Sequence, residues 1–165
     1  QENSIKTIMF FLQGLISGII GTIIFDLFQQ ALKYSYNINR IRWDLAGRYF
    51  YGLLDKRYFR EDIQNEEKIK NEIIIGYFFH YLIGSIFGVF YVLINLFFYN
   101  EPSILISIII GFITVFGGWC IMMPLAYNIG FFASKKLEQK QIIVQNLIAH
   151  FIFGIGLFIG YNLFF

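Results

Sequence analysis

The chain has 165 residues, of which 57% are hydrophobic, 21% are aromatic and only 15% are charged, and its net charge is +2. Soluble domains carry about 25% charged residues, and a water-soluble fold of this length could not hide 21 phenylalanines from water. The composition therefore excludes an ordinary soluble domain and predicts a protein whose solvent is the lipid bilayer.

The first apolar segment runs from about residue 7 to residue 28. A helix needs roughly 20 such residues to cross about 30 Å of hydrocarbon. No small-residue cleavage site follows it, so we predict an anchor that is retained. Asp26 lies near the end of this span, where a carboxylate costs roughly 2.5–3.5 kcal/mol on insertion scales. We expect Asp26 to face the bundle with a cationic partner, either Arg48 or Lys135.

The connection from residue 29 to residue 72 is long and polar, and it carries most of the basic residues. Its apolar residues Trp43, Gly47, Phe50 and Leu54 recur at helical spacing among charged ones. This pattern predicts an amphipathic helix at the headgroup level of the membrane. Acidic residues alternate with basic ones in the later part of the connection, so we do not expect nucleic-acid binding.

Three further spans follow, from about residues 73 to 99, 104 to 132 and 142 to 164. A tight turn at Asn100–Ser103 joins the second span to the third. The pair Gly117 and Gly118 together with Pro124 predicts a bend in the third span. These continuous apolar runs lack the alternation of barrel strands. The predicted fold is an all-α membrane protein, a single domain with four transmembrane helices and one interfacial helix.

The basic residues predict the orientation of this fold. Of the 13 Lys and Arg residues, only Lys6 lies outside the two connections that follow the first and third spans. Connections rich in Lys and Arg stay in the cytoplasm. We therefore predict a multi-pass protein of the bacterial inner membrane with both termini outside.

The second and fourth spans resemble each other, because residues 80–84 (HYLIG) match residues 150–154 (HFIFG). The first and third spans align loosely, with Gly14 on Gly111 and Gly21 on Gly118. Two hairpins in the same orientation would be related by a pseudo-two-fold axis along the membrane normal. The alternative is chance similarity among helices rich in Phe, Ile and Gly.

Glycines at regular spacing predict the faces on which the helices pack. In lipid, small residues let two backbones approach until van der Waals contact holds them together. The alternative is that some of these glycines clear room for a flat ligand or a second protomer. The predicted packing glycines are Gly14, Gly18, Gly76, Gly84, Gly88, Gly154, Gly156 and Gly160.

The two histidines, His80 and His150, are predicted at similar depth in two parallel spans. In one interpretation each histidine hydrogen-bonds a neighbouring group inside the bundle. A second interpretation is that both ligate a b-type haem. A third is a metal site or proton relay in which Asp26 takes part. The single cysteine, Cys120, lies within a span and predicts a buried thiol without a disulfide.

Catalytic motifs are missing from the sequence, which has no Gly-x-Ser-x-Gly, no His-Glu-x-x-His and no phosphate-binding loop. Ser134 beside Lys135 has the residue types of a nucleophile and a base, but such a pair in a loop is more typical of a helix end that contacts lipid headgroups. The polar residues expected at the cytoplasmic leaflet form one candidate ligand site: Asp26, Arg48, His80, Ser134, Lys135 and His150.

An ordered set of short motifs carries a family resemblance. The set is Gly21-Thr22 with Asp26, Gly47-Arg48, His80-Tyr81 with Gly84, Ala133-Ser134-Lys135, and His150 with Phe153-Gly154-x-Gly156-Leu157. From about residue 18 onward, the sequence resembles the DUF2938 family of small bacterial inner-membrane proteins of unknown function. The chain departs from the family pattern at Phe25, at Tyr49 and in a long connection without histidine. The resemblance implies a four-helix membrane protein and supports a single site, but it implies no biochemical activity.

We therefore expect a non-enzymatic membrane accessory protein or subunit. Its pocket in the cytoplasmic leaflet would hold a lipid headgroup or a small ligand. The alternatives are a redox component that binds haem through His80 and His150, and a small proton-coupled transporter. The expected partners are the bilayer and either a second copy of the chain or a larger membrane complex.

Overall fold

The computed structural model describes residues 2–99 and 101–163, and within them it is helical without strands. Four helices are long and apolar enough to cross a membrane, with η2 continuing α4 as a π-helix. This confirms the predicted fold class. The elements are α1 (Glu2–Tyr36), α2 (Trp43–Gly52), η1 (Leu53–Asp55), α3 (Glu72–Phe98), α4 (Ile104–Gly117), η2 (Gly118–Ala126), η3 (Phe131–Ala133) and α5 (Gln139–Leu163).

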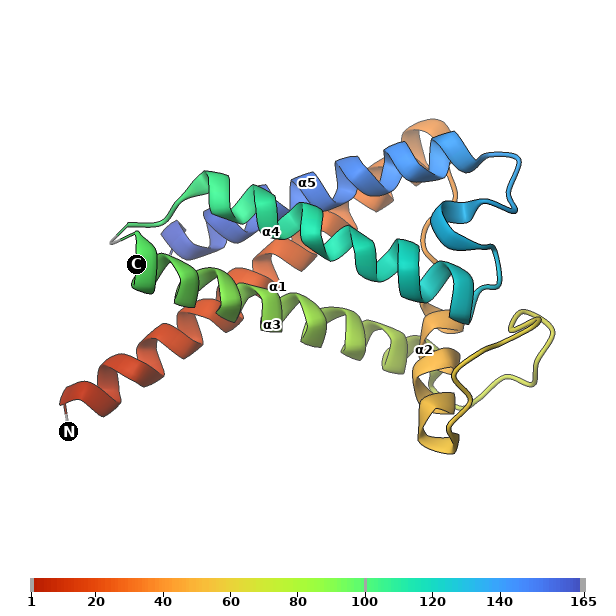
Figure 1. The fold of residues 1–165 in the computed structure, drawn as a ribbon, viewed down its shortest axis with the longest axis horizontal. Helices are drawn as coiled ribbons and strands as arrows, with labels where there is room; N and C mark the ends of the chain where they lie inside the picture. Colours follow the sequence, from red (N-terminus) through yellow and green to blue (C-terminus); the bar gives the residue numbers. More distant parts are fainter. Residues whose placement is uncertain (1, 100, 164–165) are drawn as a thin grey trace.

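The four long helices lie side by side, and α2 lies across one end of them (Figure 1). The two basic connections meet at this same end. The first helix begins and the last helix ends at the opposite end (Figure 1). Most of the charged residues are thus gathered at one end of the bundle, which we call the basic end.

Several element boundaries differ from the predicted ones. Helix α1 continues to Tyr36, because the polar residues after the apolar run remain helical. The third span ends at Ala126 rather than near residue 132. Pro124 has no N–H to donate, and the helix has π geometry from Gly118 onward. The predicted last residue of the fourth span, Phe164, and the turn residue Asn100 lie outside the described residues.

Helix α1 is the centre of the bundle, because it packs along both α3 and α5. On its α3 face, Gly18 lies against the backbone of Gly84. On its α5 face, Ser17 donates a hydrogen bond to the carbonyl of Leu157 at 2.6 Å. Helices α3 and α4 contact each other much less. The largest buried cluster joins all four long helices: Phe25, Tyr91, Ile110, Ala149, Phe153 and Leu157.

All eight glycines predicted to pack lie at close approaches between elements. A Cβ added at any of them would come within 3.0 Å of an atom of a neighbouring element. Seven of these approaches join two long helices, and Gly76 instead meets the backbone of α2. Gly117 and Gly118 differ, since a Cβ at either position would have no atom within 4 Å. Close backbone packing therefore accounts for the predicted glycine stripes.

The two hairpins, α1 with α3 and α4 with α5, run in the same orientation, but they pack in a different register from the one the sequence alignment suggested. Gly84 of α3 sits against Gly18 and Thr22 of α1. The matching Gly154 of α5 sits against Ser107, and Gly111 of α4 lies beside it. Packing therefore pairs Gly111 with Thr22 and not with Gly14, a difference of about two helical turns. The small residues at each crossing decide this register.

Candidate functional site

Helix α2 crosses α3 where two glycines meet. A Cβ on Gly47 would overlap the carbonyl of Glu72, and one on Gly76 would overlap the carbonyl of Trp43. The two backbones therefore touch. The apolar face of α2 also packs on α3, where Phe50 stacks on Phe79 at 4.5 Å between ring centroids. The predicted amphipathic helix is present, and Gly47 and Phe50 of its apolar face pack on α3. Leu54, predicted on the same face, lies in η1 and is 79% exposed.

A half-buried polar cluster lies beside this crossing. Asp26 of α1 places Oδ1 at 3.2 Å from Nε2 of His80 on α3. The hydroxyl of Tyr81 donates to Oδ2 of the same carboxylate at 3.1 Å. Trp43 at the start of α2 stacks on the imidazole, with ring centroids 4.0 Å apart and planes 28° apart. We call Asp26, His80, Tyr81 and Trp43 the imidazole cluster.

The expected pairing of Asp26 with Arg48 or Lys135 is wrong. The carboxylate meets α3 directly, because the glycine contacts between α1 and α3 bring these helices close together. The side chain of Arg48 points instead toward the connection that follows α2, and Lys135 lies in the connection between α4 and α5. The partner of Asp26 is therefore a histidine with a tyrosine, a set in which a proton can be shared.

Arg48 is 2% exposed and is held entirely by protein groups. Its Nε and Nη2 atoms form a bidentate pair with Glu72 at 2.9 and 3.0 Å. Its Nη1 atom donates to the carbonyls of Ile63 and Glu66 at 2.6 and 2.9 Å. Hydrogen bonding to Glu72 raises the pKa of Arg48 above its usual value. Arg48 therefore fastens the long connection to the start of α3, with four of its five N–H groups bonded to protein.

Ser134 and Lys135 lie in the turn after η3, apart from the imidazole cluster. The Nζ atom of Lys135 donates to the side chain of Asn128 at 2.6 Å in an exposed position. The backbone N–H of Ser134 donates to the carbonyl of Phe131 at 3.0 Å. These contacts are those of a helix end. The six predicted site residues are thus divided among separate places, and only Asp26 and His80 are directly bonded to each other.

His150 of α5 is the equivalent of His80 in the second hairpin, but its partner is Thr114, whose Oγ1 lies 2.7 Å from Nδ1. The buried ring of Phe25 touches both imidazoles, with centroids 5.4 Å from His80 and 5.3 Å from His150. A porphyrin ligated by both histidines would need the space that Phe25 and Trp43 fill. The residues around the two histidines therefore do not fit a haem.

Metal ligation finds no better support. Within the described part of the chain, no group of three or more His, Cys, Asp or Glu side chains is placed to hold a metal ion. Asp26 and His80 form a pair, and the remaining neighbours of His80 are aromatic rings. The polar contacts within the imidazole cluster are hydrogen bonds of Asp26 with His80 and Tyr81.

A pocket of about 540 Å³ opens at the basic end where α1 ends and α2 and α3 begin. Trp43 and Tyr77 line it, together with the cationic side chains of Lys33, Arg40 and Arg42. The only acid in its lining is Asp44, whose pKa is lowered by its hydrogen bond to Arg42. We call this cavity the headgroup pocket, because α2, which lines it, is predicted at the headgroup level of the membrane.

Two cations of the headgroup pocket have neutral partners. Lys33 donates to the side chain of Asn37 at 2.8 Å. Arg40 donates to Gln30 and, at 2.9 Å, to the hydroxyl of Tyr77. Arg42, in contrast, pairs with Asp44 at 2.9 Å. The hydrogen bonds of Lys33 and Arg40 leave their charges in place, so the pocket carries excess positive charge.

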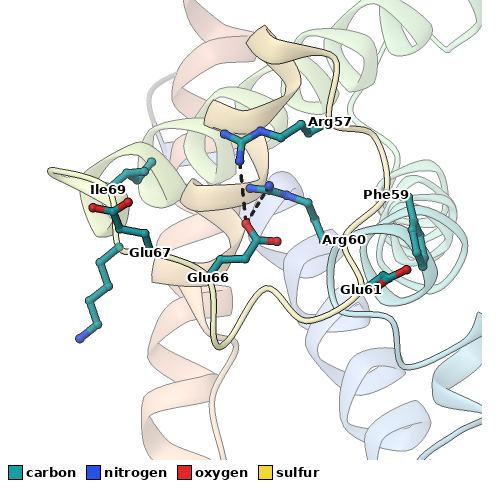
Figure 2. Close-up of a pocket in the computed structure, with 8 residues that line it drawn as sticks. Arg57, Phe59, Arg60, Glu61, Glu66, Glu67 and Ile69 are labelled. Carbon is teal, nitrogen blue, oxygen red and sulfur yellow. Dashed lines mark ion pairs between the residues drawn. The ribbon is translucent and has the colours of Figure 1, made fainter.

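A second pocket, of about 720 Å³, lies in the long connection (Figure 2). Glu66 stands between two guanidinium groups there, 2.7 Å from Arg60 and 4.0 Å from Arg57. Three basic and three acidic side chains line this pocket, so it favours no ligand charge. Arg60 is 4% exposed and also donates to the carbonyl of Arg48 at 3.1 Å. The contacts of Arg60 with Glu66 and with the carbonyl of Arg48 therefore hold the connection in place around Arg48.

The sequence matches the family of proteins of unknown function DUF2938 over residues 15–163. The chain belongs to the DUF2938 family. No curated protein and no solved structure matches it. The matched region of this DUF2938 protein includes the headgroup pocket and the imidazole cluster, so both are built on the part of the chain that defines its membership.

Sequence reasoning missed several residues of this DUF2938 protein. Tyr81 follows His80 in the His80-Tyr81 motif, and Trp43 lies one turn before Gly47 in the predicted amphipathic helix. The sequence therefore offered a reason to consider both residues. The sequence offered no such reason for Glu72 and Arg60, since only the folding of the connection brings them into contact with Arg48. Thr114 stood in the aligned third span, but the register of that alignment was wrong.

Proposed function

We propose that this DUF2938 protein is a non-enzymatic integral membrane protein that holds the headgroup of an anionic phospholipid in the headgroup pocket. The observation that carries the proposal is the excess positive charge of this pocket at the end of the bundle. Lys33 and Arg40 have neutral partners, and a phosphate oxygen accepts hydrogen bonds from both types of cation. Basic pockets between transmembrane helices on the cytoplasmic side are suited to such headgroups.

The aromatic residues of the pocket support the same ligand. Trp43 and Tyr77 each have an apolar ring and a polar tip, a combination that is favoured at the membrane–water boundary. Ile41 and Ile73 add apolar surface to the lining. A phospholipid presents a phosphate next to acyl chains, so it matches a pocket in which cations stand beside apolar side chains.

We also propose that the headgroup pocket faces the cytoplasmic leaflet of the bacterial inner membrane, with both termini outside. The sidedness of the basic residues supports this orientation. A labelling experiment tests it in a chain whose single cysteine, Cys120, is changed to alanine. We expect Tyr58→Cys, at a position that is 61% exposed, to react with an impermeant maleimide only from the cytoplasmic side. Glu101→Cys should react only from outside, and the reverse pattern would refute the orientation.

Lipid binding is tested with purified protein and phosphatidylglycerol. Each cation near a phosphate contributes about 1 kcal/mol. We therefore expect the double variant K33Q/R40Q to bind phosphatidylglycerol roughly 30-fold more weakly than the wild type. Native mass spectrometry in mild detergent measures the fraction of protein that retains the lipid. The choice of Lys33 and Arg40 leaves the pair of Arg42 and Asp44 intact.

The matched control is K136Q/K140Q, which removes two exposed cations outside the pocket, Lys136 before α5 and Lys140 in the first turn of α5. It has the same net charge as K33Q/R40Q, so a general loss of attraction to anionic lipid would affect both variants equally. Unchanged binding in the control and loss in the pocket variant is the expected pattern. Equal binding by all three proteins would show that the pocket does not hold the headgroup.

A further inference from the structure

We infer that His80 is a proton-binding site that regulates the headgroup pocket through Trp43, so that an anionic headgroup binds more tightly when His80 is protonated. This inference rests on the proposed function, since it names the regulation of the same pocket. The geometry behind it is a shared residue, because Trp43 belongs both to the pocket and to the imidazole cluster.

Trp43 is that shared residue. Its ring stacks on His80 at 4.0 Å, and Trp43 is also one of the residues that line the headgroup pocket. Tyr77, one turn before Tyr81 on α3, lines the pocket as well, and its ring centroid is 5.8 Å from that of Trp43. The contact of Gly47 with Gly76 fixes the indole in place, because α2 cannot slide along α3 without a backbone collision. A change of charge on His80 is therefore felt directly at the pocket.

Groups from α1, α2, α3 and α5 surround His80. From α1, Asp26 places a carboxylate oxygen 3.2 Å from Nε2. From α3, Tyr81 donates to that carboxylate, and from α2 the indole face covers the ring. From α5, His150 contacts the ring of Phe25, which also contacts His80. A proton on His80 would convert its contact with Asp26 into an ion pair and its contact with Trp43 into a cation–π interaction.

The direction of the pH effect follows from linkage. Histidine is the side chain whose ordinary charge change falls between about pH 5 and pH 8. Protonation of His80 adds positive charge next to Trp43, which lines the pocket, and strengthens the stacking that holds Trp43. A ligand that prefers the protonated form must bind more tightly as pH falls through the titration of His80. Affinity for the headgroup is correspondingly lost as pH rises through the same range.

The proton site is tested by fluorescence. The chain has two tryptophans, so Trp119→Phe leaves Trp43 as the only one. A stacked imidazolium quenches indole emission, so we expect this protein to lose emission between pH 8 and pH 5.5. His80→Gln on the same background should abolish the loss, whereas His150→Gln should retain it. Emission that does not change over this range in the Trp119→Phe protein would overturn the inference.

Regulation is tested by binding phosphatidylglycerol in phosphatidylcholine nanodiscs at pH 5.5 and pH 8. The phosphodiester keeps one negative charge at both values, so any difference comes from the protein. We expect about fivefold tighter binding at pH 5.5 in the wild type, which lies in the usual range of coupling between sites. His80→Gln should bind equally at both pH values.

The outcomes separate the two proposals. Absence of phosphatidylglycerol binding at either pH refutes the proposed function. Binding of equal strength at both pH values supports that function and overturns the regulation. If His80→Gln fails to fold, the His150→Gln protein, in which His80 is the only histidine, is labelled at histidine and titrated by NMR. An imidazole that does not titrate between pH 5.5 and pH 8 then overturns the inference without any loss of the side chain.

Discussion

Replacement of Gly47 by alanine is expected to separate α2 from α3 and to lower the free energy of unfolding by about 3 kcal/mol. The new Cβ would overlap the carbonyl oxygen of Glu72, and the amide nitrogen of Gly76 lies close behind it. These are backbone atoms of a long helix, so they cannot turn aside as a flexible side chain could. Unfolding in detergent, followed by near-ultraviolet circular dichroism, measures the change.

The matched control for Gly47→Ala is Gly118→Ala. A Cβ at Gly118 would meet no atom within 4 Å, so the same chemical change there adds no collision. Alanine also has the better helix propensity by about 1 kcal/mol. We therefore expect Gly118→Ala to be neutral or stabilising. Equal stability of the two variants would show that α2 and α3 do not touch through their backbones.

The Gly47→Ala variant also links the fold to the headgroup pocket. Trp43 lies one turn before Gly47, so displacement of α2 moves the indole away from both His80 and the pocket. Phosphatidylglycerol binding should fall together with stability, while the contacts of Lys135 in the other connection stay in place. A loss of stability with full lipid binding would show that the position of α2 does not matter to the pocket.

The sequence predicted the architecture well because the membrane imposes strong constraints. The length of an apolar run sets a span, and the distribution of Lys and Arg gathers the connections at one end. Glycine spacing also identified the packing faces, since Gly18 and Gly84 meet as close packing requires. These signals are local in the chain, and each has one dominant physical cause.

The candidate site was harder to predict because it depends on helix rotation and on the path of a polar connection. Depth in the membrane correctly placed Asp26 near His80, but depth alone could not decide which cation Asp26 meets. Arg48 looked available because it stood among the charged residues of a helix predicted at the headgroup level of the membrane. The chain folds back over it and supplies the carbonyls of Ile63 and Glu66. No pattern in the sequence predicts that the segment with Ile63 and Glu66 folds back onto Arg48.

The internal repeat shows a related difficulty. The resemblance of the segments that begin at His80 and His150 was strong enough to align the second and fourth spans. The alignment of the first and third spans depended on scattered glycines, and packing sets a register about two turns away. In that register His80 meets the carboxylate of Asp26, whereas His150 meets the hydroxyl of Thr114. The two hairpins therefore share the same arrangement of helices and differ in the hydrogen-bond partners of their histidines.

Replacement of Glu72 by glutamine is expected to cost about 3–5 kcal/mol of unfolding free energy, because it leaves the buried charge of Arg48 without its counterion. Arg48 is 2% exposed, and both of its bonds to Glu72 are charge-assisted. The remaining carbonyl acceptors satisfy hydrogen bonds but carry no net charge. Chemical unfolding in detergent measures the loss. Limited proteolysis should show faster cleavage in the connection between α2 and α3.

The control variant is Arg57→Gln, which removes a cation from the same connection at a side chain that is 46% exposed. Exposed ion pairs contribute about 0–1 kcal/mol, so this change should be nearly neutral. The double variant R48M/E72M completes the comparison, since removal of both charges avoids the unpaired guanidinium. We expect it to be more stable than Glu72→Gln alone. If the loss of unfolding free energy in R48M/E72M equals the sum of the losses in the two single variants, Arg48 and Glu72 act independently. The fold of the connection would then depend on Arg60 and Glu66 instead.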